Sequence, residues 1–374
     1  MVEIVPVSTK KQQREFLEYP LKMYKDNPYF VPPLWNDEAK IFDKDFAYNE
    51  VCEAVYYNAY RDGRMVGRIS GIVQRNSNER RNQKRVRFTR FDCENDEEVA
   101  RALFEAVEKW GREKGMDEIC GPLGFSNLER QGLLVEGFEE LATFEEQYNY
   151  PYYGELVEKC GYSKEVDWTE RKVTLPEDGG AELHKLSSLL EKRYHYKRCP
   201  IKSTKDLISR YGNDFLDLFE EVYSPLYGTV SFTPKIRQNL INSFKLILNV
   251  KYGGVIVNEE DKVIGFGICF PSIAKALQKS GGHLTPAALV RVLHSLKHPE
   301  ILELGLIGVA PEYRTKGAAV SLLVSLADLL AEDKNIKFAE TNMCLEDNLN
   351  IQNIWENRFS SVMHKRRRAY LKKL

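Results

Sequence analysis

The hydrophobic and polar positions of this chain follow two periods that alternate along the sequence. In the first half, residues 53–62 and 64–74 have the short period of β-strands, and Asp62-Gly63 between them is typical of a two-residue hairpin. A further strand is predicted at 85–93. A helix is predicted at 96–115, because its apolar residues recur on one face and a glycine ends the pattern.

The second half repeats this order of elements. A hairpin pattern at 252–270 is followed by a strand at 302–309, a helix at 317–333, another strand, a short helix and a terminal strand. The pattern predicts an α+β protein with two similar domains in tandem. We expect a first domain at 1–175, a polar linker at 176–200 and a second domain at 201–374.

Composition narrows the class of protein. The 374 residues are 43% hydrophobic and 29% charged, with a formal net charge of −1, which argues against a general nucleic-acid binder that relies on a basic field. We therefore expect no nucleic-acid partner. The six histidines show no metal-ligand spacing, so no metal is expected.

The cysteine pattern and the lengths of the apolar runs indicate the cellular compartment of the protein. There is no C-x-x-C pair, which excludes a zinc ribbon and favours reduced thiols. No signal-peptide pattern and no membrane-spanning run is found, so we expect a cytoplasmic protein without a membrane span. The cysteines are Cys52, Cys93, Cys120, Cys160, Cys199, Cys269 and Cys344.

The stretch "GVAPEYRTKGAA" at 308–319 has the chemistry of an anion site. A helix that begins near Lys316 leaves backbone N–H groups without internal partners, and its dipole attracts negative charge. Gly317 and the alanines after it let a phosphate approach the backbone, while Arg314 and Lys316 add charged donors. The spacing is not that of a Walker P-loop. The simpler alternative is that Gly317 eases helix packing and the charges face solvent.

These residues resemble a known motif. Arg314, Gly317 and Ala319 occupy the [QR]-x-x-G-x-[GA] positions of the acyl-coenzyme-A motif in GCN5-related N-acetyltransferases. The downstream segment 346–359 is similar to the N-x-x-A-x-x-L-Y segment of that superfamily. Nearly the whole chain resembles a bacterial family of tandem two-domain proteins with this fold, in which each domain is a mixed, mostly antiparallel sheet flanked by helices.

The resemblance implies that the second domain binds acetyl-CoA or a longer acyl-CoA as substrate. The pyrophosphate would lie on the loop, and the pantetheine arm would pair with the preceding strand where the sheet opens. The first domain would be a degenerate copy without cofactor that shapes the acceptor pocket. The expected cofactor-binding residues are Leu306, Ile307, Gly308, Val309, Arg314, Thr315, Lys316, Gly317, Ala318, Ala319 and Asn348.

The implied reaction is direct attack of an amine on the thioester. A base must hold the amine neutral, an acid can protonate the thiolate, and a backbone N–H near Ile307 or Val309 can bind the oxyanion. The family's acidic tyrosine position holds Trp355 here, whose indole is no proton source, so another group such as Tyr313 serves or the thiolate leaves unassisted. Glu303 and Glu346 are the candidate bases, with solvated strand-edge or loop carboxylates as the alternative interpretation.

A tyrosine cluster at 148–153 is a candidate for the acceptor cleft, since tyrosine joins an apolar body to a polar tip. The alternative is core packing. The expected acceptor-pocket residues are Tyr148, Asn149, Tyr152, Tyr153 and Trp355. The acceptor is either a small-molecule or a lipid-like amine, and a non-catalytic CoA-binding protein with the same fold is the alternative function.

Two segments have further readings. The leucines and valines of 285–296 form a stripe that packs on the domain, lies on a membrane surface as a peripheral contact, or walls a long-chain acyl tunnel. The basic terminus 363–374 is read as an edge strand guarded by charge, or as a site for nucleic acid or anionic lipid.

Overall fold

The computed structural model describes residues 1–247 and 249–374, and within them the chain forms two compact units. Unit 1 contains Met1–Thr169, Ile273–Val292 and His364–Leu374. Unit 2 contains Glu170–Ser272 and Leu293–Met363. Each unit has its own run of paired strands and its own apolar core.

Unit 1 is built on a sheet with the strand order β1-β2-β3-β4-β5-β14-β7. Its pairs β1–β2, β2–β3, β3–β4 and β5–β14 are antiparallel, and β4–β5 is parallel. The strands are β1 (Glu3–Pro6), β2 (Cys52–Arg61), β3 (Arg64–Gln74), β4 (Arg85–Cys93), β5 (Glu118–Gly121), β6 (Leu133–Glu136), β7 (Ser163–Thr174) and β14 (Ser360–Lys373).

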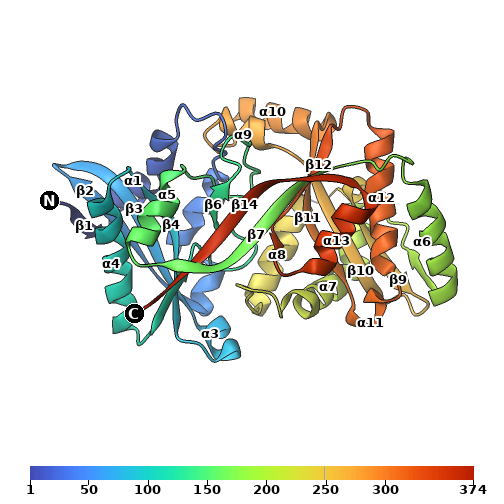
Figure 1. Cartoon of the computed structure of the whole chain (residues 1–374), viewed down its shortest axis with the longest axis horizontal. Coiled ribbons are helices and arrows are strands. Elements are labelled where there is room, and N and C mark those ends of the chain that lie inside the picture. Colours follow the sequence, from blue (N-terminus) through green and yellow to red (C-terminus); the bar gives the residue numbers. More distant parts are fainter. Residues whose placement is uncertain (248) are drawn as a thin grey trace. The chain divides into compact units, whose positions relative to one another are not determined.

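The helices of unit 1 cover this sheet. The α-helices are α1 (Lys10–Met23), α2 (Trp35–Ala39), α3 (Arg75–Arg81), α4 (Glu97–Glu113), α5 (Tyr152–Lys159) and α9 (Ala274–Gln278), and α10 (Pro286–Lys297) begins in this unit. Two 3₁₀ turns, η1 (Lys40–Phe42) and η2 (Ala47–Glu50), lie between α2 and β2. The apolar face of α4 packs into the core over β2, β3 and β4 (Figure 1).

The first predicted hairpin and helix are confirmed. Asp62 and Gly63 both have positive φ, 52° and 74°, as a two-residue turn that matches the twist of the strands requires. Asp96 is the N-cap of α4, where its carboxylate accepts from the N–H groups of Glu98 and Val99.

Unit 2 has the strand order β7-β12-β11-β10-β9-β8, with the end of β7 at its edge. The β11–β12 pair is parallel, and the others are antiparallel. Its further strands are β8 (Tyr196–Arg198), β9 (Gly253–Asn258), β10 (Val263–Pro271), β11 (Ile301–Val309), β12 (Phe338–Thr341) and β13 (Cys344–Leu345). The run β9-β10-β11-β12 repeats the run β2-β3-β4-β5, so the tandem α+β prediction is confirmed.

The helices of unit 2 lie on both faces of its sheet. They are α6 (Ala181–Tyr194), α7 (Thr204–Tyr223), α8 (Pro234–Ile247), α11 (Pro311–Arg314), α12 (Ala318–Glu332) and α13 (Leu349–Arg358), with a 3₁₀ turn η3 at Val250–Tyr252. The apolar α12 packs beside α6 and over Leu302 and Ala339 (Figure 1). Helix α7 packs against β10 and β11. None of the helices in the described part of the chain is long and apolar enough to cross a membrane.

The unit boundaries differ from those expected. Residues 176–200 were expected as a linker, but they include α6 and β8, which pack in unit 2 because both carry buried apolar side chains. The insertion after β10 joins unit 1. There Gln278 donates through Nε2 to the carbonyl of Phe30 at 2.9 Å, and His283 stacks on Trp35.

The terminal strand is not an edge strand, so that expectation is wrong. β14 lies between β5 and β7 in the sheet of unit 1. Its arginines are paired with acids instead of facing solvent: Arg367 lies 3.1 Å from Glu146, and Arg368 Nε lies 2.8 Å from Asp167. The basic run is therefore an internal, charge-paired strand.

Candidate functional site

The edge of β11 opens at its middle. The parallel pairing with β12 runs from Ile301 to Leu304 and ends there. Opposite β10, Leu304 pairs with Cys269 and Leu306 with Ile268, so Gly305 is an extra residue that forms a β-bulge. Asn342, just after β12, donates to the carbonyls of Leu304 and Gly305. Beyond this point β11 presents backbone groups that β12 does not reach.

A tyrosine of α7 occupies this opened edge. The Tyr223 hydroxyl donates to the carbonyl of Ile307 at 3.0 Å and accepts from the N–H of the same residue at 3.2 Å. Burial raises the pKa of Tyr223, so its hydroxyl is protonated at neutral pH. The sequence predicts that the backbone of Ile307 binds the pantetheine arm or an oxyanion. In the structure, its N–H and its carbonyl are both hydrogen-bonded to the Tyr223 hydroxyl.

The loop after β11 leads into α12 through a left-handed glycine. Gly317 has φ +74° and is the N-cap residue of α12. A Cβ here would lie 2.5 Å from Leu190 of α6, so both the backbone conformation and the packing demand glycine. Room for a phosphate at Gly317, the role expected from the sequence, stays a prediction.

The first turn of α12 is nevertheless compatible with an anion. It contains no acidic residue, and no side chain caps it. Its first N–H groups belong to small residues, Ala318 and Ala319, and the helix dipole adds positive potential. No acid of its own therefore lies in this turn, although Ser321, one residue further on, donates to the Glu191 carboxylate of α6 at 2.7 Å.

The cationic side chains of the loop are partly engaged. Arg314 donates through Nε to the carbonyl of Val309 at 3.2 Å, which holds the guanidinium at the end of β11. Lys316 places its Nζ 4.3 Å from the centre of the Tyr313 ring. Thr315 is exposed beside them. These residues fit the diphosphate of coenzyme A, because the guanidinium and ammonium groups retain further N–H donors.

The expected catalytic residues are not brought together. Glu303 is buried near the start of β11, beside Glu340 of β12. Tyr313 lies in α11, past the other end of the strand; at about 3.3 Å per residue the six steps from Glu303 to Val309 span roughly 20 Å. Glu346 is half-buried after β13, and Asn348 directly precedes α13. Of the three, Glu303 lies nearest in sequence to the bulge.

The expected acceptor-pocket tyrosines are core residues of unit 1. Tyr148 and Tyr153 are buried, and buried Asn149 bonds through its amide to both backbone groups of Leu134. Tyr153 accepts from the N–H of Cys93 at 3.2 Å, and half-buried Tyr152 donates to the Cys93 carbonyl at 2.8 Å. Packing, the alternative interpretation, describes this cluster.

Trp355 also belongs to a core. Its ring is buried among the apolar residues of α12, α13 and the sheet in unit 2. Burial raises the pKa of the Cys344 thiol in the same cluster to about 11. A role for Trp355 in an acceptor pocket is not supported.

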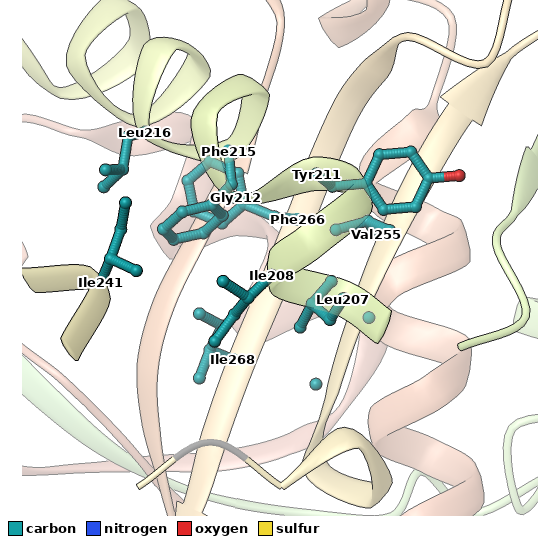
Figure 2. Close-up of a pocket in the computed structure, with 12 residues that line it drawn as sticks. Leu207, Ile208, Tyr211, Gly212, Phe215, Leu216, Ile241, Val255, Phe266 and Ile268 are labelled. Carbon is teal, nitrogen blue, oxygen red and sulfur yellow. The ribbon is translucent and has the colours of Figure 1, made fainter. Parts of the chain in front are cut away.

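Unit 2 contains a narrow apolar pocket between α7, α8, β9 and β10, with a cavity volume of about 30 Å³. Figure 2 shows Leu207, Ile208 and Phe215 of α7 facing Phe266 and Ile268 of β10. These two β10 residues pair with Gly308 and Leu306 on β11, so the pocket adjoins the opened strand.

The sequence offered no direct signal for the main residues of this site. Tyr223 ends an amphipathic helix, and only the packing of α7 on β11 brings its hydroxyl to Ile307. Asn342 follows a strand like many loop residues. The glycines of "YGGV" at 252–255 were a usable hint, because Gly254 has no atom within 4 Å of a Cβ position and so leaves the pocket open.

The sequence of this chain was compared with family models and with known proteins. No family model matches the chain. It is 26% identical to Protein YghO of Escherichia coli strain K12, over 98% of this chain and 94% of that protein. It is 25% identical to a protein named bacterial ceramide synthase from Caulobacter vibrioides, over 84% of this chain and 82% of that protein.

A solved structure covers the whole chain. The tandem GNAT protein from the clavulanic acid biosynthesis pathway matches with a TM-score of 0.58 at 12% identity, over 100% of this chain and 98% of the other. The repeated run of strands in the two units agrees with the tandem arrangement for which that protein is named. The chain thus has the tandem fold of the GCN5-related N-acetyltransferase superfamily.

Proposed function

We propose that this protein is an acyl-CoA-dependent N-acyltransferase whose donor site lies in unit 2. The observation that supports the proposal most is the opened edge of β11, where the bulge at Gly305 and the end of β12 pairing leave backbone groups beside the acid-free start of α12. Backbone donors and acceptors in a row suit the amides of a pantetheine arm. The helix start suits its diphosphate.

In the proposed reaction, the nitrogen of a neutral amine attacks the thioester carbon. A C–N bond forms, the C–S bond breaks, the amine proton goes to a base and the thiolate takes a proton. Buried Glu303, two residues before the bulge, is the base that we propose. Tyr223 is the proposed donor to the leaving sulfur, once the pantetheine amides displace its hydroxyl from Ile307.

We further propose that the acyl group is a long chain and the acceptor a lipid-like amine. The pocket next to β11 is lined by aliphatic and aromatic side chains, which favour a hydrocarbon over an acetyl group. The relative named ceramide synthase is consistent with this, because a ceramide is the amide of a long-chain amino alcohol.

Filling the pocket tests the acyl length. Gly254 lines it, and a Cβ at this position meets nothing within 4 Å, so Gly254→Phe adds a ring without a backbone clash. We expect thiol release from palmitoyl-CoA, in the presence of a long-chain amine, to fall about tenfold, a change of roughly 1.4 kcal/mol. The measurement is the rate of free-thiol formation.

Acetyl-CoA is the matched control, because its acyl group does not need the pocket. Thiol release from acetyl-CoA should change little in Gly254→Phe, and Gly254→Ala should behave like the parent chain with both donors. Equal losses with both donors would contradict the pocket as the acyl site. Preference of the parent chain for acetyl-CoA would contradict the long-chain proposal itself.

A non-catalytic CoA-binding protein is the second candidate. The position of Tyr223 favours it, since a hydroxyl that holds both polar groups of Ile307 can serve as a permanent plug of the opened edge. Free CoA would then bind through its diphosphate at the start of α12 with the plug in place, while no acyl-CoA would release thiol with any amine in a broad panel. Turnover with one amine would exclude this candidate.

A further inference from the structure

Helix α10 turns its apolar side chains toward solvent. Val290 is 67% exposed, Leu293 56% and Leu289 49%, and Leu284 just before the helix is 50% exposed. At 100° per residue the three helical side chains fall on one face together with Leu296. Exposed leucines that occur singly are ordinary, but a contiguous face of them on one helix marks a contact surface.

The opposite face of α10 carries mostly small and polar residues, with half-buried Val292 as its one larger apolar side chain. Ala288 is fully buried, and Arg291 and Ser295 are half-buried on that side. This is the reverse of a helix that packs its apolar stripe onto a domain. Packing on the domain, which the sequence left open for 285–296, therefore does not describe the stripe.

The segment that contains this helix carries charge of one sign. From Pro271 to Pro299 the chain has no aspartate or glutamate, although the whole protein has 55 acidic residues and a net charge of −1. The same segment contains Lys275, Lys279, Arg291 and Lys297, and three histidines. Lys279 and Lys297 are exposed. An acid-free, cationic segment complements a surface of negative charge.

We propose that residues 284–297 dock this protein on an anionic lipid bilayer, with α10 lying in the interface. The leucines and valine of the outward face would enter the boundary of headgroups and acyl chains, and the lysines would meet the phosphates. Leucines with interspersed cations and no acid suit a bilayer better than a second copy of the chain, because two such faces would bring like charges together. The inference does not depend on the proposed reaction.

Vesicle flotation of the full chain tests this surface. We expect binding to vesicles of phosphatidylcholine with added phosphatidylglycerol, weaker binding to phosphatidylcholine alone, and release of the protein as salt rises. The double variant Val290→Glu with Leu293→Glu should reduce the bound fraction about tenfold. Lys279→Glu with Lys297→Glu should weaken binding and remove most of its dependence on phosphatidylglycerol.

Leu189→Glu is the matched control. Leu189 is 59% exposed on α6, close to the 56% of Leu293, and it lies outside the proposed surface. It should bind vesicles like the parent chain, and circular dichroism should show that all variants are folded. Equal loss of binding in Leu189→Glu would overturn the proposal, as would absence of vesicle binding by the parent chain. Sedimentation that shows a dimer broken by the Val290→Glu and Leu293→Glu pair would instead assign the face to a second copy.

Failure of this proposal can be separated from failure of the proposed function. Thiol release with a water-soluble amine does not require a bilayer, so the docking variants should retain it. A chain that floats with vesicles and releases no thiol would support docking alone. A chain that releases thiol and does not float would support the enzyme alone.

Discussion

The two units contain the same strand–loop–helix element with opposite chemistry. In unit 1, β4 leads into α4, whose N-cap Asp96 fills the helix start and is followed by Glu97 and Glu98. In unit 2, β11 leads into α12, which begins at Gly317 without an acidic residue or a side-chain cap. Both elements share one topology, and only the second leaves its helix N-terminus to an anion.

The strand ends differ in a related way. At the end of β4, the hydroxyls of Tyr152 and Tyr153 hold both polar groups of Cys93, next to a buried pair of Arg68 and Asp92 at 2.8 Å. On β11 a single hydroxyl, that of Tyr223, holds Ile307. In unit 1 the end of the strand is bonded to two core tyrosines, whereas in unit 2 the proposed binding edge is bonded to one. A fold therefore does not by itself identify a cofactor site.

The largest effect is expected when the acidic residue at the helix start of unit 1 is introduced into the helix start of unit 2. Ala319→Glu places a carboxylate in the first turn of α12, where unit 1 has Glu98. We expect the affinity for free CoA, measured by titration calorimetry, to fall about 100-fold, because like charges meet the diphosphate. The fold should remain intact, since an acid at a helix N-terminus is favourable.

The neutral isostere separates charge from size. Ala319→Gln should retain CoA affinity near that of the parent chain, because glutamine fills the same space without the charge. Equal losses in the two variants would mean that bulk matters and that the helix start does not bind the diphosphate.

Removing one tyrosine hydroxyl from each unit should show whether the two strand ends differ in function. Tyr153→Phe and Tyr223→Phe should each lower the free energy of unfolding by about 1–2 kcal/mol in urea titrations, because backbone groups lose partners. Only Tyr223→Phe should change CoA binding, with a severalfold gain, since the pantetheine amides no longer compete for Ile307. Its turnover with acyl-CoA should fall, because the proposed proton donor is gone.

A split between binding and turnover is the outcome that identifies the role of Tyr223. If Tyr153→Phe alters CoA affinity as much as Tyr223→Phe does, the two strand ends do not differ in function. If Tyr223→Phe is merely less stable, the hydroxyl supports the fold and nothing more.

The smallest expected effect is the pH dependence of the stability that the N-cap Asp96 gives to unit 1. Hydrogen bonds from Arg61, foremost, and from the N–H groups of Val99 and Glu98 lower the pKa of Asp96 below its usual value of 3.8. Because the pKa of Asp96 is lower in the folded state, its charged form stabilises the fold at pH values above 3.8. This stabilisation is lost as the pH falls through the folded-state pKa. Asp96→Ala should therefore cost about 1 kcal/mol at pH 7.

Urea unfolding at several pH values measures this difference. The gap between Asp96→Ala and the parent chain should be constant from neutral pH down to about 5 and shrink below the usual aspartate pKa. A gap that persists unchanged in acid would show that the cap does not act through its charge. Unit 2 has no acid at the equivalent position, so no such titration is expected there.

Much of the fold was readable from the sequence because its signals are local. The hairpin at Asp62-Gly63 needs positive φ at both residues, and α4 is marked by Asp96 before an apolar stripe and Gly115 after it. The repeated order of strands and helices predicted the tandem α+β architecture. The loop at Gly317 was found for the same reason, since a glycine between a strand and a helix is a sequence signal.

The errors concern side chains whose partners are far away in the chain. The tyrosines of 148–153 looked suited to a cleft, but their hydroxyls bond to the ends of β4 and to Phe138, which lie elsewhere in the sequence. Basic β14 looked like an edge strand until its arginines met Glu146 and Asp167. The spacing of the apolar residues in α10 shows that they share one face of the helix. It does not show whether that face packs on the protein or is exposed to solvent.

The sequence by itself determined the tandem arrangement of α+β units, the position of the candidate anion loop and the absence of acid at the start of α12. These depend on backbone preference and short-range pattern. Only the tertiary structure decided that Tyr223 reaches Ile307, that the pocket adjoins β11, and that α10 turns its leucines outward. Each of these is a contact between segments distant in sequence, or the lack of one, and it is fixed by packing.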